Sequence, residues 1–277
     1  MPDEPRDPAA RPTRRWTDWL LTPPEGSERA TPSAARWLNF AAALTLVALA
    51  VYLPFLALDA PWKWSAVWRY RQKFIDGYKL TVVISVCSLG LSVLVGLLSA
   101  LAGRSRLLVL REVNRVYIDL VRGTPLLVQI LVLYYVTANA LNIDDRNVCG
   151  VLILSFSYGA YISEIVRAGI ESIGKSQLES AKAIGLTPVQ TYRYVIFPQA
   201  TRQVLPALAG QLVSLIKDSA LLSTISVAEF TQKARETSSN TASELDCYVV
   251  LAAGYLVLTL PVAWLTRRLE VGAHYET

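Results

Sequence analysis

Residues 80–102 of the chain read LTVVISVCSLGLSVLVGLLSALA, a run without a single charged side chain. A helix needs about 20 apolar residues to cross a bilayer, and only helices or closed barrels satisfy every backbone polar group there. Hydrophobic residues make up 53% of the chain and charged residues 18%, which is typical of membrane proteins. The sequence therefore predicts an all-α integral membrane protein with six transmembrane helices: Trp37–Leu58, Leu80–Ala102, Gly123–Ile143, Val148–Val166, Val204–Val227 and Cys247–Thr266.

The segments between these runs indicate the orientation, with one exception. Residues 1–36 are rich in proline and arginine and are predicted to be a disordered cytoplasmic tail, followed by an additional N-terminal span at 37–58. The exception is a group of basic residues that this topology places outside: Lys63, Arg69, Arg71, Lys73 and Lys79. Because Trp64 and Trp68 recur there at helical spacing, residues 59–76 are predicted to be an amphipathic segment in the outer interface. We therefore attribute the net charge of +5 to basic residues that face the membrane surface, and we predict no binding of nucleic acid.

A polar island interrupts the apolar runs at residues 176–198, which read SQLESAKAIGLTPVQTYRYVIFP. Ser176 with Glu179, and Thr187 with Gln190, each fit a capping box, in which a hydroxyl and an acid or amide satisfy backbone donors at a helix start. Gly185 can end the first helix in the left-handed conformation, and Pro198 is predicted to stop the second. The pattern predicts two short helices at the mouth of a helical bundle, suited to docking.

A literal phosphate-loop motif overlaps the start of this island. Residues 169–176, GIESIGKS, match G-x-x-x-x-G-K-S, whose backbone amides and Lys175 could cradle a nucleotide. Such a loop needs a preceding β-strand in a parallel sheet, and here an apolar membrane run precedes it. We therefore interpret the match as accidental. We predict no catalytic residue and no metal site.

Ionisable residues within membrane spans are costly and mark functional sites by default. Glu164 and Arg167 are three residues apart, so they share a helix face and can pair. Two interpretations stay open, a pathway for a polar solute and pairing that only fixes helix register. A zwitterion needs both a cation and an anion, and the candidates for such a pathway are Arg122, Glu164, Arg167, Lys217, Asp218 and Ser219.

The cysteines leave one question open. Cys149 and Cys247 are both predicted to begin a span at the outer face, so a disulfide between them is conceivable. Two unpaired buried thiols are the preferred interpretation, because a protein of this size does not need a disulfide bond to stabilise its fold.

The island and its surroundings resemble the EAA signature of ABC importer permeases, and in particular the polar amino acid subfamily. The resemblance covers the chain from about Gly77 onward and rests on a set of ordered motifs: Gly77 with Thr81, Arg122–Gln129 (RGTPLLVQ), Ala160–Arg167 (AYISEIVR), Gln177, Glu179 with Ala181 and Gly185, Phe197–Ala200 (FPQA), Leu205-Pro206 and Lys217–Ser219 (KDS). Within residues 77–277 it implies a five-span permease domain with a cytoplasmic two-helix coupling loop.

The same resemblance implies the function and the partners. The chain is expected to be the permease subunit of an ATP-driven importer of a polar amino acid in the cytoplasmic (inner) membrane. Its expected partners are an ABC ATPase dimer, a second permease subunit and an extracytoplasmic solute-binding protein, with ATP and Mg²⁺ on the ATPase and no cofactor on this chain. The expected coupling residues are Gln177, Glu179, Ala181, Gly185 and Pro198. The alternative is a secondary transporter driven by an ion gradient, which predicts inverted repeats that the sequence does not show.

Overall fold

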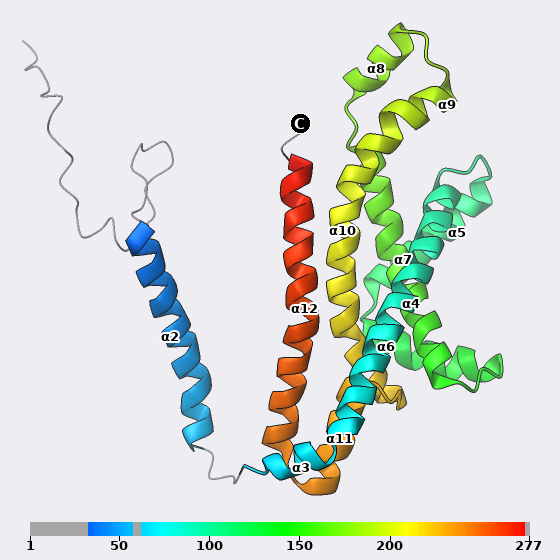
Figure 1. Cartoon of the computed structure of the whole chain (residues 1–277). Helices are drawn as coiled ribbons and strands as arrows, with labels where there is room; N and C mark the ends of the chain where they lie inside the picture. Colours follow the sequence, from blue (N-terminus) through cyan, green and yellow to red (C-terminus); the bar gives the residue numbers. More distant parts are fainter. Residues whose placement is uncertain (1–32, 58–61, 275–277) are drawn as a thin grey trace, which may run out of the picture. The chain divides into compact units, whose positions relative to one another are not determined.

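The structure is a computed structural model that describes residues 33–57 and 62–274. It divides the chain into two units, Met1–Pro61 and Trp62–Thr277. In the first unit, α2 (Ser33–Ala57) is a single helix of 25 residues, and its apolar part is Ala34–Ala50 (Figure 1). Most of the tail predicted at 1–36 lies outside the described residues, and a membrane span at 37–58 stays a prediction.

The second unit is helical throughout its described residues. Its elements follow in this order: α3 (Trp64–Arg69), α4 (Arg71–Gly103), α5 (Leu108–Gly123), α6 (Leu126–Val132), the π-helix η1 (Leu133–Ala138), α7 (Arg146–Glu171), α8 (Lys175–Ala183), α9 (Pro188–Thr191), the π-helix η2 (Tyr192–Ile196), α10 (Phe197–Asp218), the 3-10 helix η3 (Ser219–Ile225), α11 (Phe230–Thr241) and α12 (Glu244–His274). Residues 71–76, predicted as part of the interfacial segment, belong to the first turns of α4.

Four of these helical stretches are long and apolar enough to cross a membrane: α4, α7, Pro188–Ile225 and Glu244–Glu270. The span predicted at Gly123–Ile143 corresponds to the helix Leu126–Ala138, which is too short to count alone and meets the preceding α5 at an angle of 113°. The break falls at Thr124-Pro125, where both residues have extended backbone angles, as the residue before a proline prefers. The described part of the chain therefore contains four candidate spans, or five with the bent pair, and six stays a prediction.

Close packing of α4 on α7 forms the centre of the second unit, and it depends on small residues. Ser88, Ser92 and Ser99 are buried along α4, and the Ser99 hydroxyl donates to that of Ser163 at 2.9 Å. A Cβ added to Gly159 would lie 2.5 Å from Val95 Cγ1. Small residues let helix backbones approach within a membrane, where burial of apolar surface does not drive association.

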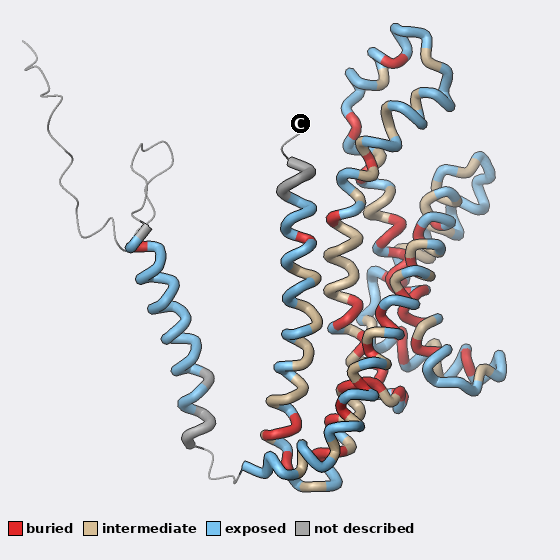
Figure 2. Tube along the Cα trace, in the orientation of Figure 1, coloured by how far each residue is buried: buried red, intermediate tan, exposed pale blue. Residues whose placement is uncertain are grey.

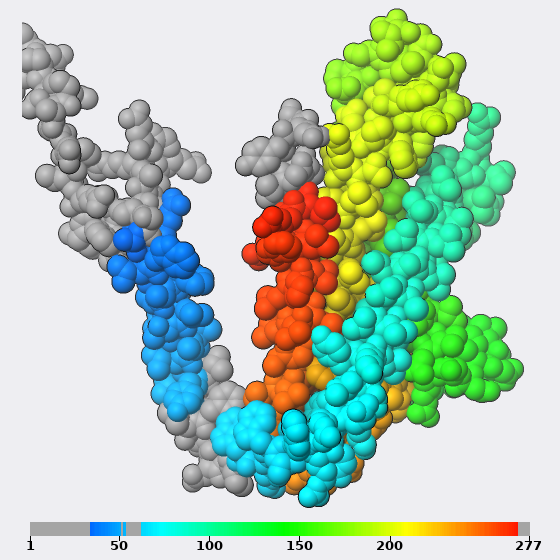
Figure 3. Space-filling model, in the orientation of Figure 1, coloured from blue at the N-terminus to red at the C-terminus, as the bar shows by residue number. Residues whose placement is uncertain are grey.

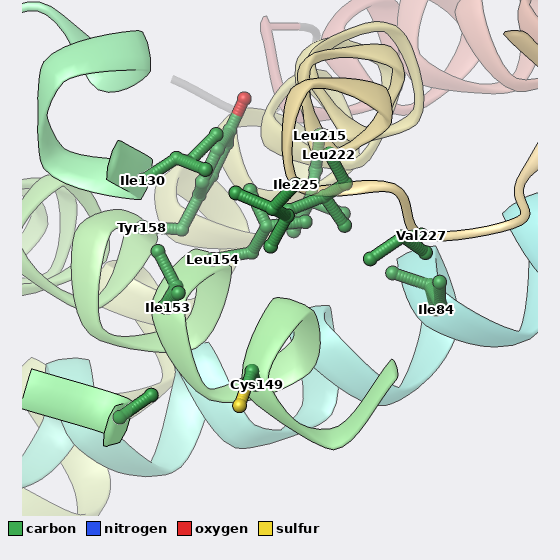
Figure 4. Packing of buried hydrophobic residues seen from close by; sticks show 11 residues of the cluster. Ile84, Ile130, Cys149, Ile153, Leu154, Tyr158, Leu215, Leu222, Ile225 and Val227 are labelled. Atoms are coloured by element: carbon green, nitrogen blue, oxygen red, sulfur yellow. The ribbon is translucent and has the colours of Figure 1, made fainter. Parts of the chain in front are cut away.

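Next to this contact, α6, α10 and η3 complete one apolar core. Figure 4 shows Ile130, Leu154, Tyr158, Leu215 and Leu222 converging there from different helices. Burial is uneven between the candidate spans, since 61% of the most apolar part of α7 is buried but only 6% of that of α12 (Figure 2). The exposed apolar flank of α12 is thus suited to lipid or to another subunit.

The three cysteines are all free thiols. Cys149 and Cys247 are buried in two different hydrophobic clusters, so the open question of a disulfide resolves to two unpaired thiols. Cys87 is exposed on the surface of α4.

Candidate transport pathway and coupling loop

The two-helix loop predicted from the island is present as α8 and α9, at one end of the second unit (Figure 1). The turn between them is tightly specified. Gly185 has φ +77°, its N–H donates to Lys182 O at 3.0 Å, and the N–H of Leu186 donates to Ala181 O at 3.0 Å. This pair of bonds is a Schellman motif, which needs a left-handed residue at the position of the glycine. The predicted role of Gly185 as a helix end is confirmed.

Of the two predicted capping boxes, only the second forms. Thr187 N–H donates to Gln190 Oε1 at 2.9 Å, and Gln190 N–H donates to Thr187 Oγ1 at 3.3 Å, with Pro188 in the first turn. The prediction of a capping box at Ser176 and Glu179 is wrong, because α8 begins at Lys175 and its N-cap is Gly174. Ser176 therefore lies inside the first turn, past the position from which a hydroxyl can cap.

The prediction that Pro198 stops the second helix is also wrong. The helical path continues from Pro188 to Ile225 as one apolar stretch, and Pro198 lies in the first turn of α10. The π-helix η2 precedes it, and the wider hydrogen-bonding pattern of such a segment accommodates a residue that cannot donate. The second island helix is thus continuous with the following span.

The tip of the loop carries apolar side chains that nothing in the described chain covers. Ile184 is 75% exposed, Val189 76% and Tyr194 64%. Figure 3 shows this yellow-green surface protruding at one end of the second unit. Gln177 and Glu179 are exposed as well, whereas Ala181 is buried inside the loop. Exposed apolar groups on a rigid protrusion are typical of a protein contact surface.

The predicted ion pair between Glu164 and Arg167 exists and is part of a larger network. Arg167 Nε donates to Glu164 Oε1 at 2.8 Å, and Arg122 Nη1 donates to Glu164 Oε2 at 2.8 Å. Arg167 also reaches Glu171 at 2.6 Å. The network links the last turn of α5, beside the bend, to the part of α7 that leads into α8.

Lys217 and Asp218, by contrast, do not pair with each other. Asp218 Oδ2 accepts a hydrogen bond from the Tyr158 hydroxyl at 2.6 Å, and Lys217 is exposed. Ser219 is fully buried, and its hydroxyl donates to the backbone carbonyl of Ile216 at 2.8 Å. Tyr158 was not among the predicted site residues. A tyrosine amid an apolar span was the available signal, because a buried hydroxyl needs a partner.

Gln129, the last residue of the RGTPLLVQ motif but not a predicted site residue, holds the bend between α5 and α6. Gln129 is buried, and its Nε2 donates to Val121 O at 2.7 Å and to Thr124 O at 2.9 Å. Its Oε1 accepts from the Ser157 hydroxyl at 2.6 Å. The amide thus replaces backbone bonds lost at the break and joins it to α7.

Beside this bend lies a groove of about 830 Å³. Its lining comes from α4, α5, α6, η1 and α7 and is almost entirely apolar, with Leu98, Val113, Leu120, Val132 and Phe156 among its residues. A polar amino acid needs hydrogen-bonding groups and charges, so this groove does not suit it. The polar residues around Asp218 are the better candidates.

Glu229, also missed, is a buried carboxylate at the start of α11. It is 0% exposed, and it accepts from the N–H groups of Thr231 and Gln232, both at 2.8 Å, and from the Tyr255 hydroxyl at 3.2 Å. Burial raises the pKa of Glu229 to about 7, against the opposing effect of these donors.

This pKa predicts a pH dependence of stability. The folded pKa lies above the ordinary value of 4.5, so the folded protein binds more protons between about pH 4.5 and 7. The contribution of Glu229 to stability is therefore complete below about pH 4.5 and is lost as pH rises through about 7. We expect Glu229→Gln to remove this loss when Tm is followed between pH 5 and 8 in detergent. The exposed Glu244→Gln is the control and should keep it; an identical slope in the Glu229 variant would refute the assignment.

The residues that match the phosphate-loop motif do not follow a β-strand, which a nucleotide-binding loop of this kind requires. Residues 169–171 are the end of helix α7, and Lys175 begins α8. The motif therefore joins two helices instead of following a strand.

Comparison with known proteins gives a consistent result. The family described as "Binding-protein-dependent transport system inner membrane component" matches residues 92–273. The glutamine transport system permease protein GlnP of Escherichia coli strain K12 is 38% identical over 210 residues, which cover 75% of this chain and 95% of that protein. The L-cystine transport system permease protein TcyB of Bacillus subtilis strain 168 is 36% identical over 203 residues, 73% of this chain and 86% of that protein.

A solved structure of an amino acid ABC transporter with histidines is similar with a TM-score of 0.71 and 33% identity, covering 76% of this chain and 99% of that one. These similarities favour an ABC importer permease over an ion-driven secondary transporter. The chain belongs to the family of inner membrane components of binding-protein-dependent transport systems and is a multi-pass permease subunit of that kind.

Proposed function

We propose that this permease imports a polar amino acid of the glutamine type across the cytoplasmic membrane, with energy from a separate ABC ATPase dimer. The observation that carries the proposal is the α8–α9 loop, rigidly capped and apolar at its tip. Relatives named for glutamine and cystine transport support the substrate class. A second permease subunit and an external solute-binding protein complete the expected assembly. ATP and Mg²⁺ are proposed to bind to the ATPase, with no catalytic residue and no cofactor expected on this chain.

In this proposal the α8–α9 loop sits in a groove of the ATPase and moves with it. The continuity of α9 with α10 gives the movement a direct path to Asp218, the last residue of α10. Gln177, Glu179, Ala181, Gly185 and Pro198 are the coupling residues, although only Gly185 has a local geometry that explains its identity. Rigid-body movement of such a loop would rock the bundle between its two open states.

The substrate is proposed to bind near Asp218 and Lys217. The Asp218 carboxylate can receive the ammonium of a zwitterion, and the exposed Lys217 can receive its carboxylate. Arg122, Glu164 and Arg167 satisfy one another, so we assign them to holding the bend against α7.

A photo-crosslinker at position 189 tests the docking of the loop. Val189 is 76% exposed at the loop tip, so illumination of the assembled complex should give an adduct between this chain and the ATPase. Val113, 61% exposed on α5, is the matched control position and should give none. An intact complex that yields no adduct from position 189 would show that the loop docks elsewhere.

A further inference from the structure

One surface of the second unit is not explained by transport. The α3 surface comprises Trp64, Trp68, Arg69, Arg71, Lys73 and Ile75, at the junction of α3 and α4. Figure 1 shows α3 lying crosswise to α12, at the end of the unit opposite to α8 and α9. If the α8–α9 loop is cytoplasmic, this basic surface lies on the outer side, against the usual distribution of Lys and Arg.

The α3 surface is held in place by contacts on its other side. Lys63 donates its backbone N–H to Asp246 Oδ2 at 2.9 Å and its Nζ to Ala242 O at 3.0 Å. Val67 packs against the buried cluster that contains Phe74 and Phe230. These contacts fix α3 to the start of α12, so its outward side chains project from a rigid support.

The outward side chains are large and aromatic. Trp64 is 50% exposed and stacks on Trp62 at 5.6 Å between ring centroids. Trp68 is 72% exposed, and the guanidinium of Arg71 lies 4.9 Å from its ring centroid. Tryptophan is enriched where hydrocarbon meets lipid headgroups, because its ring is apolar and its N–H is polar.

The cations on the same surface have no acidic partner among the described residues. Arg69, Arg71 and Lys73 form no salt bridge there, although Lys73 Nζ lies 5.3 Å from the Tyr70 ring. The one carboxylate in the adjoining turns, Asp76, accepts a hydrogen bond from Gln72 at 3.0 Å. The surface therefore presents positive charge that an external anion can neutralise.

An exposed apolar face of α4 leads directly from this surface. Ile75, Val83, Val86 and Leu94 recur at helical spacing and are 44%, 55%, 59% and 53% exposed. This face continues through the span, so acyl chains lying along it would bring their headgroups to Arg71 and Lys73. A soluble acidic protein would match the charges but not this apolar continuation.

We propose that the α3 surface binds anionic phospholipids, with their phosphates on Arg69, Arg71 and Lys73 and their acyl chains along α4. The tryptophans set the depth of α3 in the interface, and the cations select the headgroup. The choice of the outer leaflet rests on the proposed function, but lipid binding itself does not. The α3 surface thus anchors the outer end of α4 next to α11 and α12.

Native mass spectrometry of the full chain in uncharged detergent tests this proposal. We expect phosphatidylglycerol to bind more tightly than phosphatidylcholine, and Arg69→Gln/Arg71→Gln/Lys73→Gln to weaken phosphatidylglycerol by about fivefold per charge removed. Arg69→Lys/Arg71→Lys keeps the charges and should restore binding. The matched control, Lys175→Gln/Lys182→Gln/Arg193→Gln, removes three charges from the region of α8 to η2 and should leave lipid binding unchanged.

Several outcomes would overturn the proposal. They are equal affinity for the two lipids, unchanged phosphatidylglycerol binding by the triple Gln variant, or complete displacement of phosphatidylglycerol by inorganic phosphate. Thermal unfolding of each variant identifies misfolding, and the charge-retaining variant then decides the outcome. The lipid-binding measurement does not include the ATPase. Its result therefore does not depend on whether the chain is the permease of an ATP-driven importer.

Discussion

Gly185→Val is expected to abolish ATP-driven uptake while the protein stays folded in the membrane. Gly185 has φ +77°, which a β-branched residue tolerates poorly, at a cost of about 1–3 kcal/mol. That strain opens the turn between α8 and α9 without touching the core, because a Cβ at this position meets nothing within 4 Å in the chain. The side chain would instead face the partner. Uptake in vesicles and membrane abundance are the two measurements.

Two further substitutions show which property of Gly185 matters. Gly185→Asn accepts a positive φ but adds bulk, whereas Gly185→Ala adds little bulk but is strained. Gly174→Ala is the control, since its Cβ would approach only Ser176 Oγ, at 3.6 Å. Normal uptake by the Val variant would remove the α8–α9 loop from the coupling mechanism.

Asp218→Asn is expected to reduce uptake by about a hundredfold, because the loss of one charge of a desolvated ion pair costs about 2–5 kcal/mol. The carboxylate is partly buried beside the Tyr158 hydroxyl and is the proposed partner of the substrate ammonium. Asparagine has almost the same shape and can still accept from Tyr158, so the fold should persist. Initial rates over a range of substrate concentrations would measure the effect.

Tyr158→Phe separates a substrate role from a structural role of this pair. It removes the 2.6 Å hydrogen bond to Asp218 but leaves the charge, so we expect a loss of about tenfold. If the two variants lowered uptake and Tm equally, Asp218 would only hold α7 to α10. Lys217→Gln should weaken substrate binding without changing Tm, since Lys217 is exposed.

Features set by neighbouring residues could be predicted from the sequence. The box at Thr187 and Gln190 and the turn at Gly185 depend on side chains and backbone within a few positions. The long apolar helices could also be predicted, because the bilayer sets the length and composition of each spanning helix independently of the others.

Where a local rule failed, a helix began, ended or broke at a residue other than the predicted one. Ser176 cannot cap because α8 starts one residue earlier, and Pro198 does not end a helix because the π-turn of η2 precedes it. The span predicted at 123–143 is shorter in the structure, where the helix Leu126–Ala138 follows α5 (Leu108–Gly123) across the bend at Thr124-Pro125. A two-residue shift of a helix start, or a π-turn, leaves no clear signal in the pattern of apolar residues.

Partners distant in the chain were beyond sequence reasoning. Arg122 pairs with Glu164 across 42 positions, and Tyr158 with Asp218 across 60. A charged or hydroxyl side chain within an apolar span indicates that it needs a hydrogen-bonding partner. The packing of α7 against α5 and α10 decides which residue that partner is. Glu229 gave even less signal, because its burial depends on α11, α12 and Gly77 together.

Reconstitution tests the central claim, that this chain is the permease of an ATP-driven amino acid importer, most directly. The chain, the ABC ATPase and the solute-binding protein would be placed in liposomes and given labelled glutamine. We predict accumulation that requires ATP and all three proteins, is insensitive to ionophores, and is lost in Gly185→Val. Uptake by the chain alone that follows an ion gradient and ignores ATP would contradict the claim.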